Sequence, residues 1–313
     1  MPKASNSLGL EVDEDPIIVK VREIYGPVIK KVSKIRSPDL MIKYLRKMYK
    51  LIVKPYIVYL TVAAFMNNRP VLYEGPPGTG KTEIGEAILS LWAGKSAFVL
   101  PCSESYDEYR VIGDFHPAIA MAKGFNEESF IPRPLLAALI LDTGVLIDEI
   151  RRSNEGFQNL LLDIIDKRRI IVPELRKTYY QRGDGFQIIM TSNPLDIAQN
   201  ELSDAFMRRL IRIEFRYPTP EEEYNIIMLR LGGLAKYITD ELISRAIRIV
   251  KELRRKAVYK PGTADLVSWL TITAMLAKAK NKMKADKHDL IEAGRAVLLK
   301  DPEDENIVEE LLR

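Results

Sequence analysis

The sequence predicts an α/β domain with a parallel sheet covered by helices, followed by a small all-α domain. Three observations support this. Short apolar runs alternate with helix-like segments over residues 55–218, the pattern of strand–helix–strand units. After Pro218-Thr219-Pro220 the pattern becomes wholly helical. The chain of 313 residues is 47% apolar and 29% charged, which suits a globular protein of about two domains.

The N-terminal range, residues 1–54, is predicted to hold a loose tail (1–16) and basic helices. From Ile17 to Lys54 there are eleven Lys or Arg and two acids, and apolar residues recur at helical spacing. This pattern indicates one or two basic amphipathic helices. Their cationic side is either a solvated face or a docking surface for an acidic partner or nucleic acid.

The middle range, residues 55–218, is predicted to be the α/β domain. Its expected strands are 70–74, 97–101, 144–148, 186–191 and 210–215. Its expected helices are 56–65, 82–91, 135–141 and 155–166. Two connections, 103–134 and 168–185, are longer than the others. In the last range, 219–313, three or four helices fill 221–300, and the acidic residues 301–310 are expected to cap or fray.

Composition excludes several classes of site. A single cysteine, Cys102, excludes a disulfide framework and a multi-cysteine metal site. Two histidines, His116 and His288, argue against a histidine zinc site. No run of about 18 residues is apolar and uncharged, and the first residues do not resemble a signal peptide. A reduced cytoplasmic setting is therefore expected, with Cys102 and His116 in structural roles.

A phosphate-binding loop follows the first predicted strand. Its pattern is G-x-x-x-x-G-K-[ST], and its residues are Gly75, Pro76, Pro77, Gly78, Thr79, Gly80, Lys81 and Thr82. Glycines let backbone N–H groups surround phosphate oxygens, and the following helix adds positive potential at its N-terminus. Lys81 is expected to reach the β- and γ-phosphates and Thr82 to hold magnesium. The loop predicts ATP and Mg²⁺ as ligands.

Two further strands end in polar residues. The buried run Val145–Ile147 ends in Asp148 and Glu149 at the carboxyl edge of the sheet, where ligands bind in open α/β folds. Asp148 is expected to hold the magnesium through water, and Glu149 to act as general base on the attacking water. Strand 186–191 leads to Asn193, which is predicted to reach the γ-phosphate and orient that water.

Over roughly 55–300 this set of motifs resembles the AAA+ ATPases, and within them the MoxR-type branch. The specific features are LIDEIRRS at 146–153, TSNP at 191–194 and LSDAFMRRL at 202–210. The resemblance implies that Arg209 is an arginine finger entering a neighbouring subunit, with Arg208 beside it. A guanidinium suits charge developing on a γ-phosphate. Segment 103–134 looks like the branch's insertion in helix 2, and 168–185 like the hairpin before TSNP. The resemblance implies that both face the central pore or the substrate.

The sequence departs from the family pattern at two places. Arg151 replaces an Asn of the usual D-E-I-N-R-A, while Arg152 matches the family Arg and is expected to face the subunit interface. In the helical domain, Asp265 stands where the family has a sensor arginine. Asp265 followed by Trp269 is similar to the CoxD-like subgroup. Lys260 is considered as a substitute cation and disfavoured.

The resemblance implies a ring-forming ATPase that remodels or matures a protein complex. The ring is expected to be a homo-oligomer, a hexamer. Its client is expected to be a protein, with a von Willebrand A domain partner as one option. A second hypothesis is a nucleic-acid-dependent motor or restriction-type NTPase, based on the basic range 17–54, although a guanine-reading N-K-x-D is missing. A third is an ATP-binding regulatory switch with little turnover. The lysines from 278 to 287 are expected to be a solvated helix end.

Overall fold

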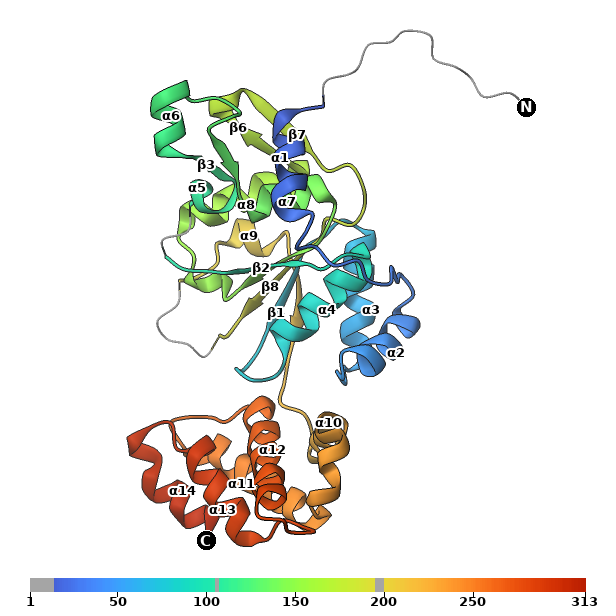
Figure 1. Ribbon diagram of the computed structural model, residues 1–313, viewed down its shortest axis with the longest axis vertical. Coiled ribbons are helices and arrows are strands. Elements are labelled where there is room, and N and C mark those ends of the chain that lie inside the picture. The colour runs from blue at the N-terminus through green and yellow to red at the C-terminus, as the bar shows by residue number, and fades with distance from the viewer. Residues whose placement is uncertain (1–13, 105–106, 195–199) are drawn as a thin grey trace, which may run out of the picture.

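A computed structural model describes residues 14–104, 107–194 and 200–313 of the chain (Figure 1). Most of the predicted loose tail, residues 1–13, lies outside the described residues. The described chain forms an α/β domain and, below it in Figure 1, a helical domain joined to it by one extended connection. The predicted fold class is confirmed.

The α/β domain is centred on a five-stranded parallel sheet of order β2-β5-β8-β1-β9. The strands are β1 (Val71–Glu74), β2 (Phe98–Pro101), β5 (Val145–Asp148), β8 (Ile188–Ser192) and β9 (Ile211–Glu214). Glu74 pairs in register with Ser192 and Glu214, and Asp148 with Pro101. Because all strands run in one direction, their polar ends meet at one edge of the sheet.

Helices cover both faces of this sheet, and alternate strand residues enter different apolar clusters. Tyr73 and Ile189 pack in one cluster, and Leu72 and Met190 in the other. The first face carries α2 (Pro38–Met48), α3 (Pro55–Met66) and α4 (Lys81–Ala93). The second carries α1 (Pro16–Tyr25), α7 (Pro134–Leu141), α8 (Glu155–Lys167) and α9 (Asp204–Met207).

The basic range 17–54 supplies two of these covering helices. Met41 and Leu45 of α2 are fully buried, as are Ile17 and Val21 of α1. Several of the basic side chains in this range have partners. Lys20 donates to three backbone carbonyls of residues 127–130, at 2.7–2.9 Å. The two helices therefore pack on the α/β domain through apolar faces.

Two segments outside the central sheet each form a small antiparallel pair of strands. Between β2 and α7 lie α5 (Glu108–Val111), β3 (Gly113–Phe115), α6 (Pro117–Lys123) and β4 (Phe130–Pro132). Strands β3 and β4 pair antiparallel with α6 between them. After α8 a second antiparallel pair forms, from β6 (Arg169–Val172) and β7 (Lys177–Tyr180). The predicted hairpin at 168–185 is thus present.

The helical domain, called the lid below, has its own apolar core. Its α-helices are α10 (Pro220–Leu231), α11 (Asp240–Lys256), α12 (Thr263–Ala279), α13 (Lys287–Leu298) and α14 (Glu305–Leu312). Trp269 lies in its centre, fully buried, and its indole N–H donates to the Leu290 carbonyl at 2.8 Å. The acidic segment 301–310 does not simply fray: most of it forms α14, which buries Val308.

Among the described helices we find none whose length and apolar character would let it span a bilayer.

Candidate functional site

The predicted phosphate loop connects β1 to α4, as the pattern requires. Gly80 is the residue before α4 and has φ of +85°, a left-handed conformation that side chains other than glycine rarely adopt. Gly78 has φ of +69°, and a Cβ there would lie 2.6 Å from the Cα of Gly262 in the lid. Glycine is therefore required twice: to turn the loop and to let the lid backbone approach it. The Thr263 N–H of the lid donates to the Gly78 carbonyl at 3.0 Å.

The Lys81 ammonium group is buried inside this loop. It donates to the carbonyls of Gly75 at 2.8 Å and Pro76 at 2.7 Å. Burial lowers the pKa of Lys81 to about 8, against the opposing pull of the Asp148 and Glu149 charges. An anion in the loop would restore the pKa by favouring the charged form of the lysine.

The lowered pKa of Lys81 predicts how the affinity for ATP depends on pH. Without nucleotide Lys81 loses its proton near pH 8, whereas phosphate oxygens stabilise its charged form, so binding takes up a proton above that pH. We expect an affinity that is flat below pH 8 and falls by up to about tenfold per pH unit above it. Titrations of a fluorescent ATP analogue across this range measure it. Lys81→Arg should lack the fall because arginine does not titrate there. Equal wild-type affinities at pH 7 and 9.5 would contradict the assignment.

Three motifs meet at the Asp148 carboxylate. Thr82 of the phosphate loop donates to its Oδ1 at 2.8 Å, and Thr191 of β8 donates to the same oxygen at 2.5 Å. Carboxylate and hydroxyl oxygens are ligands that Mg²⁺ accepts, usually together with substrate phosphates and water. Thr82 and Asp148 therefore fit the predicted magnesium site. Thr191 was not singled out from the sequence, although it ends a buried strand at the same edge.

Glu149 follows in a left-handed backbone conformation, with φ of +56°. Such a conformation costs roughly 1–3 kcal/mol in a residue other than glycine and is typical of functional sites. Its N–H donates to the Thr191 hydroxyl at 2.9 Å, which holds the backbone in place. Its carboxylate forms an ion pair with Arg152 at 2.8 Å. Both side chains are about half exposed, so this pair lies at the surface of the domain.

Asn193 lies directly after β8, two residues beyond Thr191 and at the same edge of the sheet. Its side chain is partly buried. The order of the sheet places this strand end between the ends of β5 and β1, hence between Asp148 and the phosphate loop. The predicted water-orienting role of Asn193 stays a prediction.

Arg151, which replaces the Asn of the family pattern, joins three polar ends of the sheet. Its guanidinium donates to the Ser192 hydroxyl at 2.8 Å and to the Glu74 carboxylate at 2.9 Å. Glu74 is buried at the end of β1 and also pairs with Arg212 of β9. The arginine thus joins the loop after β5 to the ends of β8 and β1. Sequence reasoning missed Glu74; the one signal for it was an acid closing an apolar run directly before the phosphate loop.

Arg208 and Arg209 follow α9. The guanidinium of Arg209 lies in a fork with Asp166 of α8, with Nε to Oδ1 at 2.8 Å and Nη2 to Oδ2 at 2.7 Å. Its Nη1 donates to the Ala205 carbonyl at 2.8 Å. Arg208 has an exposed side chain, and its carbonyl accepts from Arg69. These contacts hold Arg209 on the α8 side of the domain. The finger role remains a prediction.

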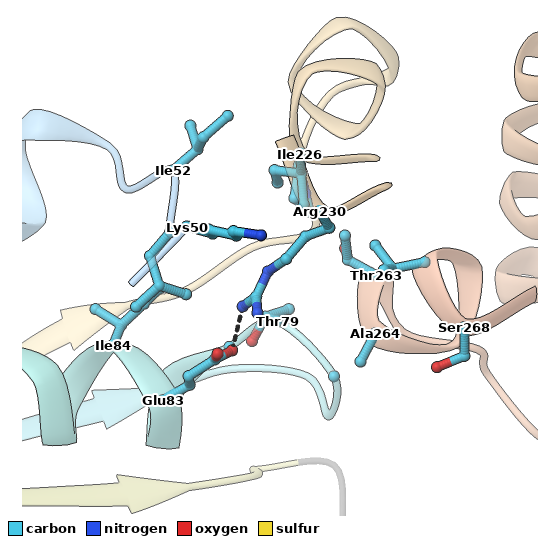
Figure 2. A pocket seen from close by; sticks show the side chains of 15 residues that line it. Lys50, Ile52, Thr79, Glu83, Ile84, Ile226, Arg230, Thr263, Ala264 and Ser268 are labelled. Atoms are coloured by element: carbon cyan, nitrogen blue, oxygen red, sulfur yellow. Dashed lines mark hydrogen bonds and ion pairs between the residues drawn. The ribbon is translucent and has the colours of Figure 1, made fainter. Parts of the chain in front are cut away.

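A cavity of about 290 Å³ adjoins the phosphate loop on the side of the lid. Figure 2 shows side chains from three parts of the chain around it: the segment before α3, the start of α4, and lid helices α10 and α12. Its lining includes the apolar residues Ile52, Ile84 and Ile226. Asp148 and Glu149 are not among its lining residues. A nucleotide with its phosphates in the loop could extend its nucleoside end into this cavity.

Asp265, which stands where the family has a sensor arginine, and Lys260, the disfavoured substitute cation, both have contacts within the lid. Asp265 accepts from the Gly262 N–H at 2.7 Å and so caps α12. Lys260 donates to the carbonyls of Arg254 at 2.9 Å and Ala257 at 3.4 Å. Neither residue lines the cavity beside the phosphate loop.

The remaining single candidates have structural surroundings. Cys102 is buried, and burial raises the pKa of its thiol to about 12, which makes it a poor nucleophile. The His116 carbonyl accepts N–H groups at the start of α6. Lys280 and Lys282 both pair with the fully buried Asp289 of α13, so they contribute less free positive charge than the sequence suggests. Among the described residues no cluster of three or more His, Cys, Asp and Glu could hold a metal alone.

Comparison with known proteins gives one domain match, three curated relatives and one solved structure. Residues 70–210 match the AAA domain (dynein-related subfamily). The chain is 24% identical to the uncharacterised protein YehL of Escherichia coli over 276 residues, 82% of this chain and 76% of that protein. It is 25% identical to CbbQ of Hydrogenophilus thermoluteolus over 187 residues, which are 59% of this chain and 67% of CbbQ. It is 26% identical to NorQ of Paracoccus denitrificans over 188 residues, which are 60% of this chain and 67% of NorQ. A crystal structure of a candidate ATPase from Cytophaga hutchinsonii covers 95% of this chain and 96% of that one, at 17% identity and a TM-score of 0.47. The domain match and the sheet order agree with the predicted fold class, a parallel sheet covered by helices and followed by a helical lid, as in an AAA+ core.

Proposed function

We propose that this protein is an ATP-hydrolysing, ring-forming AAA+ ATPase of the MoxR type that remodels or matures a protein complex. One observation carries the proposal: the Asp148 carboxylate accepts hydrogen bonds from Thr82 of the phosphate loop and from Thr191 of β8, the strand that leads to Asn193. Three motifs far apart in the sequence thus converge on one point. The match to an AAA domain and the similarity to CbbQ and NorQ support the proposal.

In this proposal the phosphate loop and Lys81 bind the triphosphate, and Thr82 and Asp148 hold Mg²⁺, which neutralises phosphate charge. Glu149 accepts the proton of the attacking water, and Asn193 orients that water. Before it can accept this proton, the Glu149 carboxylate has to leave its ion pair with Arg152 and contact the water instead. Arg209 acts on the γ-phosphate of a neighbouring subunit, so turnover requires a ring, which we expect to be a hexamer. The assignment to the CoxD-like subgroup stays a prediction.

Replacing Lys81 by alanine tests the nucleotide site. The buried ammonium donates to two loop carbonyls, and its loss would remove a charge-assisted contact to phosphate. We expect ATP affinity to fall by about a hundredfold or more. Equilibrium titration with a fluorescent ATP analogue measures the loss, with Lys95→Ala as the control because Lys95 donates to the Leu141 carbonyl away from the loop. Unchanged affinity in Lys81→Ala would overturn the proposed site.

The client can be identified with a Glu149→Gln variant used as an ATP-bound trap. Loaded with ATP and magnesium and recovered from lysate, it should retain a discrete protein partner that the Lys81→Ala variant does not retain. Such a partner, for example one with a von Willebrand A domain, would support the remodelling role. Nucleic acid that stays bound at moderate salt would instead favour a nucleic-acid-dependent motor. It would also assign a role to the exposed basic residues of α2, such as Lys43 and Arg46.

A further inference from the structure

An ion pair crosses the cavity beside the phosphate loop. The Arg230 guanidinium, from lid helix α10, lies 2.5 Å from the Glu83 carboxylate, on the first turn of α4 (Figure 2). Both residues line the cavity, and they are 147 positions apart in the sequence. The pair therefore connects the lid to the helix that begins at the phosphate loop.

The two charges of this pair would act in opposite ways on a bound polyphosphate. Glu83 directly follows Thr82, so its carboxylate lies close to the N-terminal turn of α4 that would hold phosphate. The nearby Glu86 has a raised pKa, chiefly through burial and then through the charge of Glu83. A nucleotide brings further negative charge to this acidic side of the loop. An arginine at this point favours the nucleotide, whereas the carboxylate opposes it.

Arg230 also lines the same cavity as the phosphate-loop residues Gly78, Thr79 and Gly80 and carries donors that suit phosphate. A guanidinium carries five N–H donors, and the ion pair with Glu83 uses Nη2. The arginine side chain is about one quarter exposed, lies inside the cavity lining and comes from the lid. Lys260, the substitute cation considered from the sequence, makes its described contacts within the lid, as does Asp265 at the position of the family's sensor arginine.

We propose that Arg230 is the lid cation that binds the nucleotide at the inner end of its phosphate chain, and that Glu83 restrains it while the cavity is empty. The proposal rests on the proposed nucleotide site. Binding of ATP or ADP transfers the guanidinium from the carboxylate to the phosphate, which brings α10 and the lid onto the nucleotide. Because the cavity lies away from Asp148 and Glu149, the contact is the same for ATP and ADP.

Two substitutions with opposite expected effects test this. Arg230→Gln should weaken ATP and ADP binding alike, by about tenfold, because it removes one charge-assisted contact. Glu83→Gln keeps the size and hydrogen-bonding ability of the side chain and removes its charge, so affinity should rise by about threefold or more. Equilibrium titration with fluorescent ATP and ADP analogues at physiological salt gives the values. Arg255→Gln is the matched control, since Arg255 is an exposed lid arginine paired with Glu252.

Three results would overturn the inference. If both substitutions weakened binding by the same factor, the pair would only hold the lid in place. If Arg230→Gln behaved like Arg255→Gln, Arg230 would not bind the nucleotide. If Arg230→Gln affected ATP but not ADP, the contact would be to the γ-phosphate. Lys81→Ala separates these failures from failure of the site itself. Loss of binding in that variant with no effect at Arg230 rejects only the inference, whereas equal binding by wild type and Lys81→Ala rejects the nucleotide site.

Discussion

Glu149→Gln is expected to bind ATP as tightly as the wild type and to hydrolyse it about 10²–10⁴-fold more slowly, the usual contribution of a positioned general base. The backbone of Glu149 is fixed by the Thr191 hydroxyl, and the substitution leaves that contact intact. The ion-pair partner of its carboxylate is Arg152, outside the phosphate loop. Removing the negative charge therefore removes proton acceptance and spares the binding site. Steady-state phosphate release and equilibrium ATP titration measure the two effects separately.

A matched control for this prediction is Glu155→Gln. Glu155 is an exposed acid at the start of α8, six positions further along the chain, and makes no contribution to the described site. We expect it to retain wild-type turnover. Residual turnover in Glu149→Gln close to that of Glu155→Gln would show that another group takes the proton from the water.

Arg209→Ala is expected to reduce turnover by about 10³-fold or more, the range found for arginine fingers, with ATP affinity nearly unchanged. Asp166 and the Ala205 carbonyl accept from Nε, Nη2 and Nη1 of this guanidinium and hold it within its own subunit. To act as the finger, Arg209 has to exchange part of these contacts for the γ-phosphate of a neighbouring subunit. Arg208→Ala is the natural control, because Arg208 is its exposed neighbour.

Mixing two inactive variants tests whether the finger acts between subunits. Arg209→Ala retains an intact phosphate loop, and Lys81→Ala retains an intact finger. In a mixed ring, the Lys81→Ala subunit can supply Arg209 to a neighbour that binds ATP, so part of the activity should return. If mixing restored nothing while both variants still assembled, or if Arg208→Ala lost activity instead, the assignment of Arg209 would be wrong.

The sequence was most informative where function depends on consecutive residues. The phosphate loop, the acids after β5 and the strand ending near Asn193 were found because each is a short pattern at a predicted strand end. Their meeting at one sheet edge followed from parallel strands alone. The boundaries of β1 and α4 differ from the predicted ones by one or two residues, which is the usual uncertainty at element ends.

Contacts between distant residues were not predictable in the same way. Glu74 and Arg151 are 77 positions apart, and nothing in either local pattern indicates that the arginine reaches the end of β1. The pairing of Glu83 with Arg230 depends on how the lid packs on the core. The expectation that the acidic segment 301–310 caps or frays held only in part, for a related reason: Asp301 caps the short helix 302–304, but from Glu305 on the segment forms α14. Its charges suggested solvent, while Val308 and Leu312 had a bundle surface to cover.

The contact between Gly78 and the lid has a mechanical consequence. Thr263, whose N–H donates to the Gly78 carbonyl, is the first residue of α12, a helix of 17 residues. At 1.5 Å per residue this helix is about 25 Å long, and its near end is fixed to the loop that would surround the phosphates. A rotation of about 10° around that point would move the far end by about 4 Å. Pivoting at this contact, the helix would act as a lever that converts a small rearrangement of the phosphate loop into a displacement of several ångström at the far end of the lid.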